Sequence, residues 1–168
     1  MKRLLSTILL LIVFPYPSAG QSTQQNQAVL ALKNQLIQIL INKDTTGFLS
    51  LIASSGITFG ADSEKQFKPQ IAEQFSQKRD AYCFLFDSKC LSREAGRKRQ
   101  APPCSMHELV SRANGWSMEY QLGQNEGTSQ VSLVLKPNNE WCSNGRDPIS
   151  FVFTQFEDGW KLVAVPYE

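Results

Sequence analysis

The clearest alternation of apolar and polar positions lies in residues 149–167. Two runs rich in β-branched and aromatic residues, ISFVFTQF and WKLVAVPY, flank Glu157-Asp158-Gly159. Asp-Gly supplies the positive φ angle that a tight turn needs, so the pattern predicts a β-hairpin. Both faces of the hairpin carry large apolar groups, which indicates that both are at least partly covered and that these strands are not a bare edge of the sheet.

The register of this hairpin depends on the type of turn. A two-residue turn at Asp158-Gly159 would place the odd-numbered residues 149–153 on one face with Trp160, Leu162 and Ala164. A three-residue turn ending at Gly159 would place them with Val163, Val165 and Tyr167 instead. A slip of one residue exchanges the two faces, so the sequence leaves both registers open.

A second hairpin precedes the first. Apolar and polar residues alternate from Trp116 to Leu122, and apolar residues recur at every second position of 129–136, with a polar turn between the two runs. This spacing predicts two antiparallel strands. A twelve-residue loop, 137–148, leads from them to the last hairpin. Loops of this length are usually functional or pinned, and Cys142 offers the pin.

Helical spacing dominates the first half of the chain. Apolar residues at three- and four-residue intervals predict an amphipathic helix from Ala28 to about Asn42, after a frayed polar segment, 21–27. Further expected elements are a short helix capped by Asp44 or Thr45, a short strand at Ile57–Phe59, a helix with Pro69 in its first turn that runs to about Arg79, an extended run at Tyr82–Phe86, a loop at 92–103 and one or two helical turns between Met106 and Ala113.

Helices followed by strands favour an α+β fold, with N-terminal helices packed on a curved, mostly antiparallel sheet of four to six strands. Two stretches, KDTTGFLSLIASSGITFGAD and the terminal FTQFEDGWKLVAV, resemble the NTF2-like (SnoaL-like, cystatin-like) cone superfamily. The resemblance covers about two-thirds of the mature chain and indicates no specific family. It implies a cone that holds a small apolar ligand or presents its sheet to a partner, as a monomer or a homodimer. The segment 83–103 and the loop around Cys142 depart from the pattern.

Residues 1–20 have the features of a secretory signal peptide. Lys2 and Arg3 precede an apolar run, Leu4–Phe14, and small residues follow Pro15 and Pro17. We expect cleavage near Gly20 and Gln21 and export to the periplasm or the medium, which leaves 21–168 as one α+β domain. An uncleaved anchor is disfavoured because the run is well short of the roughly 20 residues that span a bilayer. No cysteine lies near the cleavage site, which argues against a bacterial lipoprotein.

Charge and cysteine content refine this assignment. Without Lys2 and Arg3 the 17 basic residues become 15, equal to the 15 acidic ones, so no global charge favours nucleic acid or an anionic membrane as partner. Four cysteines in an exported chain predict two disulfides, with three pairings open. We favour a local Cys83–Cys90 bond and a long Cys104–Cys142 bond. A four-cysteine zinc site lacks any C-x-x-C pair and is disfavoured, and no cofactor is expected.

Candidate chemistry is sparse. His107 is the only histidine and follows Cys104 by three positions, so a Cys–His nucleophile is conceivable unless Cys104 is disulfide-bonded. No carboxylate pair, phosphate-binding loop or nucleophile elbow is present. An anion or partner patch is an interpretation of Arg97 and Arg99, although a solvated loop explains them as well.

Tryptophan and tyrosine residues are the remaining candidates. Trp116 and Tyr120, with the other strand aromatics, would line an apolar pocket or simply fill the core. Trp141 lies in a polar loop and would be a contact residue or a lid over the core. The sequence therefore favours a secreted small binding or interaction protein, disulfide-tied enzyme inhibitors included. The alternative is a small extracytoplasmic enzyme that uses His107 with a carboxylate.

Overall fold

The computed structural model describes residues 19–60, 64–90, 104–112, 116–125, 127–137 and 148–166; at 19–23 and 125 it describes the backbone only. Helices come first and strands last, as the sequence predicts. In chain order the elements are α1 (Ala19–Asn42), α2 (Thr45–Leu51), β1 (Thr58–Phe59), α3 (Lys68–Gln77), α4 (Ala81–Phe86), α6 (Met106–Val110), β2 (Trp116–Asn125), β3 (Thr128–Pro137), β4 (Ile149–Phe156) and β5 (Gly159–Val165).

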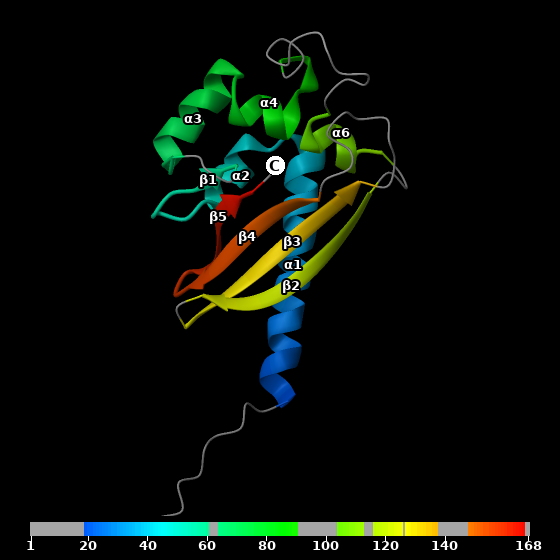
Figure 1. Ribbon diagram of the computed structural model, residues 1–168, viewed down its shortest axis with the longest axis vertical. Helices are drawn as coiled ribbons and strands as arrows, with labels where there is room; N and C mark the ends of the chain where they lie inside the picture. The colour runs from blue at the N-terminus through cyan, green and yellow to red at the C-terminus, as the bar shows by residue number, and fades with distance from the viewer. Residues whose placement is uncertain are drawn as a thin grey trace, which may run out of the picture.

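The strands form one open five-stranded sheet in the order β1-β5-β4-β3-β2. All neighbours run antiparallel except β1, which pairs in parallel with β5. Figure 1 shows α1 crossing one face of this sheet, with the shorter helices gathered around the C-terminal end of α1. The predicted α+β class, with helices on a mostly antiparallel sheet, is therefore confirmed.

The terminal hairpin adopts neither predicted register in full, because its two-residue turn is Glu157-Asp158 and Gly159 already belongs to β5. Next to the turn Phe156 pairs with Gly159, which has a φ of 104°, and Phe153 pairs with Leu162. A bulge after Val152 then shifts the register, so that Val152 pairs with Ala164. The buried face consequently contains Leu162 before the bulge and Val165 after it. Because β5 lies between β4 and β1, neither hairpin strand is an edge, as expected.

The core fills the space between α1 and the inner face of the sheet. One stripe of α1 is buried, and so is every second residue along β3 and β4, in agreement with the periodicities of a helix and a strand. The side chains with no exposed surface in these three elements are Val29, Leu36, Leu40, Val131, Leu133, Leu135, Phe151 and Phe153. Phe151 and Phe153 of β4 are thus core residues.

A second group of aromatic side chains packs between the short helices. Phe48 of α2 contacts Phe75 of α3 and Phe86 of α4, with ring centroids 5.9 and 6.3 Å apart and an edge-to-face arrangement. Tyr82 joins this group, 5.6 Å from Phe86. Edge-to-face pairs suit the ring quadrupoles and fix the relative positions of the helices.

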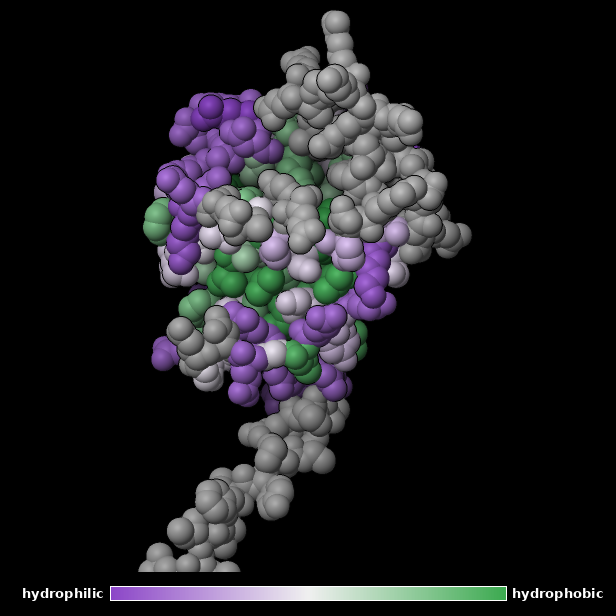
Figure 2. All heavy atoms as spheres, in the orientation of Figure 1, coloured by the Kyte–Doolittle hydropathy of each residue, from purple (hydrophilic) through white to green (hydrophobic). Residues whose placement is uncertain are grey.

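The outer face of the sheet is not uniformly polar. Val134 is only 7% exposed there and Val152 is half-buried. Figure 2 shows apolar residues in the middle of the visible face, over the sheet, with hydrophilic residues around them. This distribution agrees with the prediction that both faces of the terminal hairpin are at least partly covered.

Two local predictions were wrong. Tyr82–Phe86 is helical rather than extended: α4 buries Cys83, Leu85 and Phe86, and it pairs with no described strand that could satisfy an extended backbone. The first helix begins at Ala19 and not at Ala28, so the segment 21–27 is helical. Glutamine is a good helix former and the segment contains no proline or glycine, so the apolar stripe underestimates the length of the helix.

The other helix boundaries agree with the sequence signals. Asp44 caps α2 and its side chain accepts from the backbone N–H of Gly47 at 2.8 Å. Pro69 lies in the first turn of α3, which buries Ile71 and Phe75. Gly56 has the left-handed φ of 91° expected after α2. A Cβ there would lie 2.8 Å from the carbonyl oxygen of Gln66, so the turn has room for glycine only.

Candidate functional site

The inner face of the sheet changes from apolar to mostly polar as its strands approach the two hairpin turns. Along β3 the buried Val131 is two residues after Ser129, and along β4 the buried Phe153 is two residues before Gln155. These positions share a face because side chains alternate along a strand. Trp160 of β5 pairs with Gln155 and completes this row. Polar groups thus stand where the apolar core ends.

The facing helix changes in the same way. One turn before the buried Val29 and Leu32, α1 presents Gln25 and Ala28, with Gln24 beside them. Residues four apart on a helix lie on one face, so these side chains extend the core-facing stripe beyond the core. The helix–sheet interface therefore opens into a groove at the end that carries the two hairpin turns.

The groove has a volume of about 430 Å³, and the described residues that line it are Gln24, Gln25, Ala28, Ser129, Gln155 and Trp160. None of the six carries a charge. Each glutamine amide offers both hydrogen-bond donors and an acceptor, and the serine hydroxyl does so as well. Trp160 packs partly against the core and adds an aromatic surface. The lining can therefore hydrogen-bond an uncharged polar molecule while the indole covers an apolar face of it.

Of the residues in this groove, sequence reasoning suggested only Trp160, as one of the strand aromatics that could line an apolar pocket. It assigned 24 and 25 to a frayed segment and gave no role to Ser129 or Gln155. The sequence did contain a signal. The other odd-numbered residues of the two predicted strands are apolar and face inward, whereas Ser129 and Gln155 are polar. Once the register is known, such exceptions indicate where a core gives way to a site.

Two aromatic residues that the sequence suggested for binding lie elsewhere. The indole Nε1 of Trp116 donates to the carbonyl oxygen of Val110 at 3.1 Å, which joins β2 to α6. Tyr120 is 37% exposed in the middle of β2. Neither residue lines the groove. The other suggested binding residues, Trp141, Arg97 and Arg99, lie outside the described residues.

His107 connects two helices. Its Nδ1 lies 3.0 Å from the carbonyl oxygen of Leu40, in the last turn of α1, and 3.3 Å from the hydroxyl of Ser111. The last four carbonyl groups of a helix lack the regular partner within it. The Leu40 carbonyl accepts a long bond from the backbone N–H of Lys43 at 3.4 Å, and Nδ1–H of His107 supplies a second, shorter one. Ser105 and Glu108 form a capping box that fixes the start of α6 and thereby the position of His107.

Removal of this contact tests its structural role. We expect His107→Ala to lower the free energy of unfolding by about 1 kcal/mol, because the Leu40 carbonyl oxygen loses its shorter bond and keeps only the 3.4 Å bond from the backbone N–H of Lys43. His107→Asn places an amide N–H near the position of Nδ1 and should restore part of that loss. Urea denaturation of the three proteins measures the effect. An unchanged midpoint in His107→Ala would contradict the assignment.

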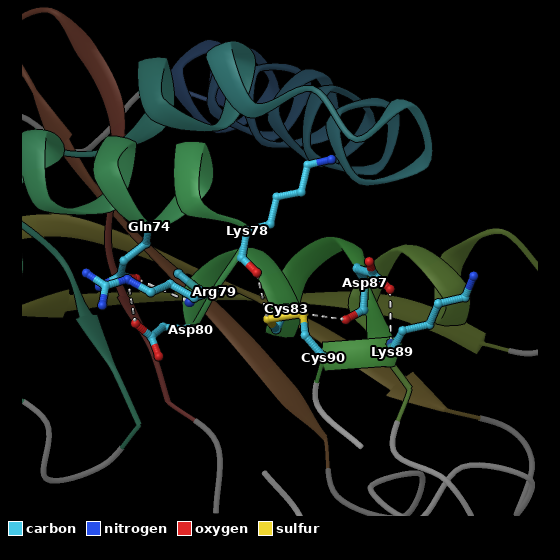
Figure 3. The surroundings of a disulfide bond; sticks show 9 residues. Gln74, Lys78, Arg79, Asp80, Cys83, Asp87, Lys89 and Cys90 are labelled. Carbon is cyan, nitrogen blue, oxygen red and sulfur yellow. Dashed lines mark hydrogen bonds and ion pairs between the residues drawn. A yellow bond between two sulfur atoms is a disulfide. The ribbon is translucent and has the colours of Figure 1, made fainter. Parts of the chain in front are cut away.

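The expected local disulfide is present. Cys83 of α4 and Cys90 are bonded, with their Cα atoms 5.5 Å apart (Figure 3). Cys104 is disulfide-bonded as well, so it offers no thiol for a Cys–His pair with His107. Its predicted partner, Cys142, lies outside the described residues. Arg79, which precedes α4, forms ion pairs with Glu73 and Asp80 at 3.6 and 3.7 Å.

The described residues contain neither a candidate metal site nor a helix suited to a membrane. No three histidine, cysteine or carboxylate side chains there are grouped so that they could hold a metal ion. None of the helices in those ranges has the length and apolar content that a membrane span requires.

Comparison with known proteins gives a likeness of fold. No protein-family model matches the chain, and no curated protein matches it. A variant of a protein named Rd1NTF2_05 aligns at 14% identity over 86% of this chain and 99% of its own, with a TM-score of 0.45. A cystatin-like protein of unknown function from Nostoc punctiforme aligns at 11% identity over 85% and 89%, with a TM-score of 0.45.

A third structure, an NTF2-like protein from Cytophaga hutchinsonii, aligns at 14% identity over 84% of this chain and 95% of its own, with a TM-score of 0.39. The names of these structures are those of the superfamily that the sequence resembles, and they indicate no specific family. Likeness at this level concerns the general fold and carries no information on ligand or activity.

Proposed function

We propose that this protein is a secreted or periplasmic binding protein that holds a small, uncharged, polar ligand between α1 and the turn end of its sheet. The observation that carries the proposal is the groove, where the described lining residues provide three glutamine amides, a serine hydroxyl and Trp160 and none of them is charged. Its volume of about 430 Å³ lies within the range of roughly 300–1,000 Å³ that small-molecule sites occupy.

The lining also argues for the class of ligand. An apolar ligand, as the resemblance implies, would leave the amides of Gln24, Gln25 and Gln155 without partners when it displaced their water. A charged ligand would find no counter-ion among the six residues. A molecule with several hydroxyl or amide groups and one apolar face satisfies both the amides and the indole.

Export is part of the same proposal. Two properties support it: the signal-peptide features of residues 1–20 and the disulfide between Cys83 and Cys90, which requires an oxidising compartment to persist. Cleavage before Gln21 would leave α1 starting at the first mature residue, one turn before the groove. The enzyme alternative gains no support from His107, because the described partners of its Nδ1 are a backbone carbonyl and a hydroxyl.

Native mass spectrometry of the protein purified from the exported fraction tests the proposal. We expect a denatured mass that corresponds to residues 21–168 with every thiol oxidised, and a native mass increased by a carried ligand. Trp160→Ala should lose that ligand, with affinity reduced at least about tenfold, since the aromatic wall is gone. Gln155→Ala should weaken binding with less effect on the core, because its side chain is exposed.

Trp116→Ala is the matched control, because it removes an indole outside the groove and should keep the ligand. A bare native mass for the exported protein would contradict the proposal, and so would equal retention of the ligand by Trp160→Ala and the unaltered protein.

A further inference from the structure

β2 is an open edge of the sheet. It pairs with β3 over ten consecutive residue pairs without interruption, and no described strand lies on its other side. All residues from Glu119 to Gln124 are exposed. A long, regular edge strand presents a row of backbone N–H and C=O groups that another strand can pair with.

This edge lacks the devices that normally protect one. Within Trp116–Asn125 there is no proline, no lysine or arginine and no bulge. The only charged residue is Glu119, and the ammonium of Lys136 on the neighbouring strand neutralises it at 2.6 Å. Soluble proteins usually place a charge, a proline or a bulge on an exposed edge to prevent pairing. β2 has neither a proline nor a bulge, and its one charge is offset by Lys136, which indicates a strand that pairs with another chain.

The backbone groups available for pairing belong to alternate residues. In an antiparallel ladder every second residue directs its N–H and C=O away from its neighbour. Met118 belongs to this outward set, because its carbonyl oxygen accepts from Lys33 Nζ of α1 at 2.6 Å. Tyr120, Leu122 and Gln124 have the same parity. Lys33 therefore covers the start of the edge, and the outward groups after it stay available.

The side chains at these positions are apolar and exposed. Tyr120 and Leu122 keep 37% and 47% of their surface accessible on the face that α1 covers elsewhere. Leu30, one helical turn before Lys33 on α1, is 47% exposed. The edge therefore offers what an added strand needs. The backbone groups would supply hydrogen bonds for affinity, and the apolar side chains would supply contacts that fix the register.

We propose that β2 pairs with β2 of a second copy of this protein, antiparallel across a twofold axis at Gln121. In this register Tyr120 lies opposite Leu122 of the second copy, and the reverse pair repeats on the other side of the axis. The outward backbone groups of these residues meet each other, as a hydrogen-bonded pair requires. The apolar faces of the two sheets stay on the same side, so the sheet continues through the dimer.

Self-complementarity favours a second copy as the occupant. Glu119, the only charge on the strand, faces Gly123 of the second copy, so no like charges meet. Each copy supplies both members of the Tyr120–Leu122 pair, which makes the strand complementary to itself, as an isologous interface requires. The groove between α1 and the β4–β5 turn is not part of this edge, so the dimer does not depend on the proposed ligand.

Sedimentation equilibrium of the exported protein tests the dimer. We expect a monomer–dimer equilibrium that Leu122→Lys shifts to monomer, because it places a charge on each copy's edge and removes the Tyr120 contact. Phe156→Lys is the matched control: this residue is 41% exposed on β4, away from the β2 edge, and its change should leave the dimer intact.

Cross-linking tests the register. Under mild oxidation Gln121→Cys should yield a covalent dimer, since the two positions face each other across the axis, whereas Glu119→Cys should not. A monomer at all concentrations overturns the proposal, even if it captures extended peptides from other proteins. A dimer that Phe156→Lys dissociates and Leu122→Lys leaves intact overturns it as well, and a dimer in which Glu119→Cys cross-links better than Gln121→Cys overturns the register.

Discussion

Replacement of Phe153 by alanine is expected to lower the free energy of unfolding by about 3–5 kcal/mol, the cost usual for a buried phenylalanine. The side chain has no exposed surface and lies on the inner face of β4 between Val131 and Leu162, its cross-strand partners. Its removal leaves a cavity that two sheet neighbours and α1 cannot fill without moving. Urea denaturation, followed by the fluorescence of the tryptophan residues, measures the loss.

Phe156→Ala is the control for this prediction. Phe156 lies on the same strand, three residues on and on the opposite face, and it is 41% exposed. Its replacement should change the free energy of unfolding by less than about 0.5 kcal/mol, as surface substitutions usually do. Equal effects of the two substitutions would mean that Phe153 is not at the centre of the core and that the register at the bulge differs from the one described.

The comparison of Phe153 with Phe156 also shows what sequence could predict. The spacing of apolar residues identified both hairpins and the helices other than α4, because burial of one face imposes a period on the residues. The bulge after Val152 was beyond that reasoning. It adds one residue to β5, so Leu162 and Val165 both face inward although their spacing is three. A local pattern contains no information on where two strands slip relative to each other.

The two wrong element predictions have a common cause. Tyr82–Phe86 contains residues that favour strands, yet tertiary packing against Phe48 and Phe75 overrides this weak preference. The segment 21–27 is polar, and the absence of an apolar stripe was taken for the absence of a helix. In both cases the backbone conformation was inferred from the types of side chain alone, and these did not determine it.

The candidate site was less predictable than the fold. Its residues come from the start of α1, the start of β3, the end of β4 and the start of β5, and only the assembled sheet brings them together. His107, the residue that chemistry alone selected, is explained by its bond to Leu40 at the end of α1. The single histidine suggested a site, but the polar residues on the inner face of the strands, Ser129 and Gln155, indicated the position of the groove better.

Removal of the Cys83–Cys90 disulfide is expected to lower the free energy of unfolding by about 2.5 kcal/mol. This value follows from the loop-entropy model for residues with a sequence separation of seven. The double variant Cys83→Ala, Cys90→Ala should show it in urea denaturation. Because Cys104 is also disulfide-bonded, reduction of the unaltered protein should cost more than this double substitution.

The loss should be concentrated in α4. A helix of six residues is not stable alone, so α4 depends on its tertiary contacts, which are the aromatic rings around Phe86 and the bond at Cys83. Hydrogen exchange should therefore accelerate at the α4 amides of the double variant more than in β3 and β4, where strands are paired on both sides. Uniform acceleration throughout the sheet, or unchanged protection of α4, would show that packing alone holds this helix and that the bond acts only on the unfolded chain.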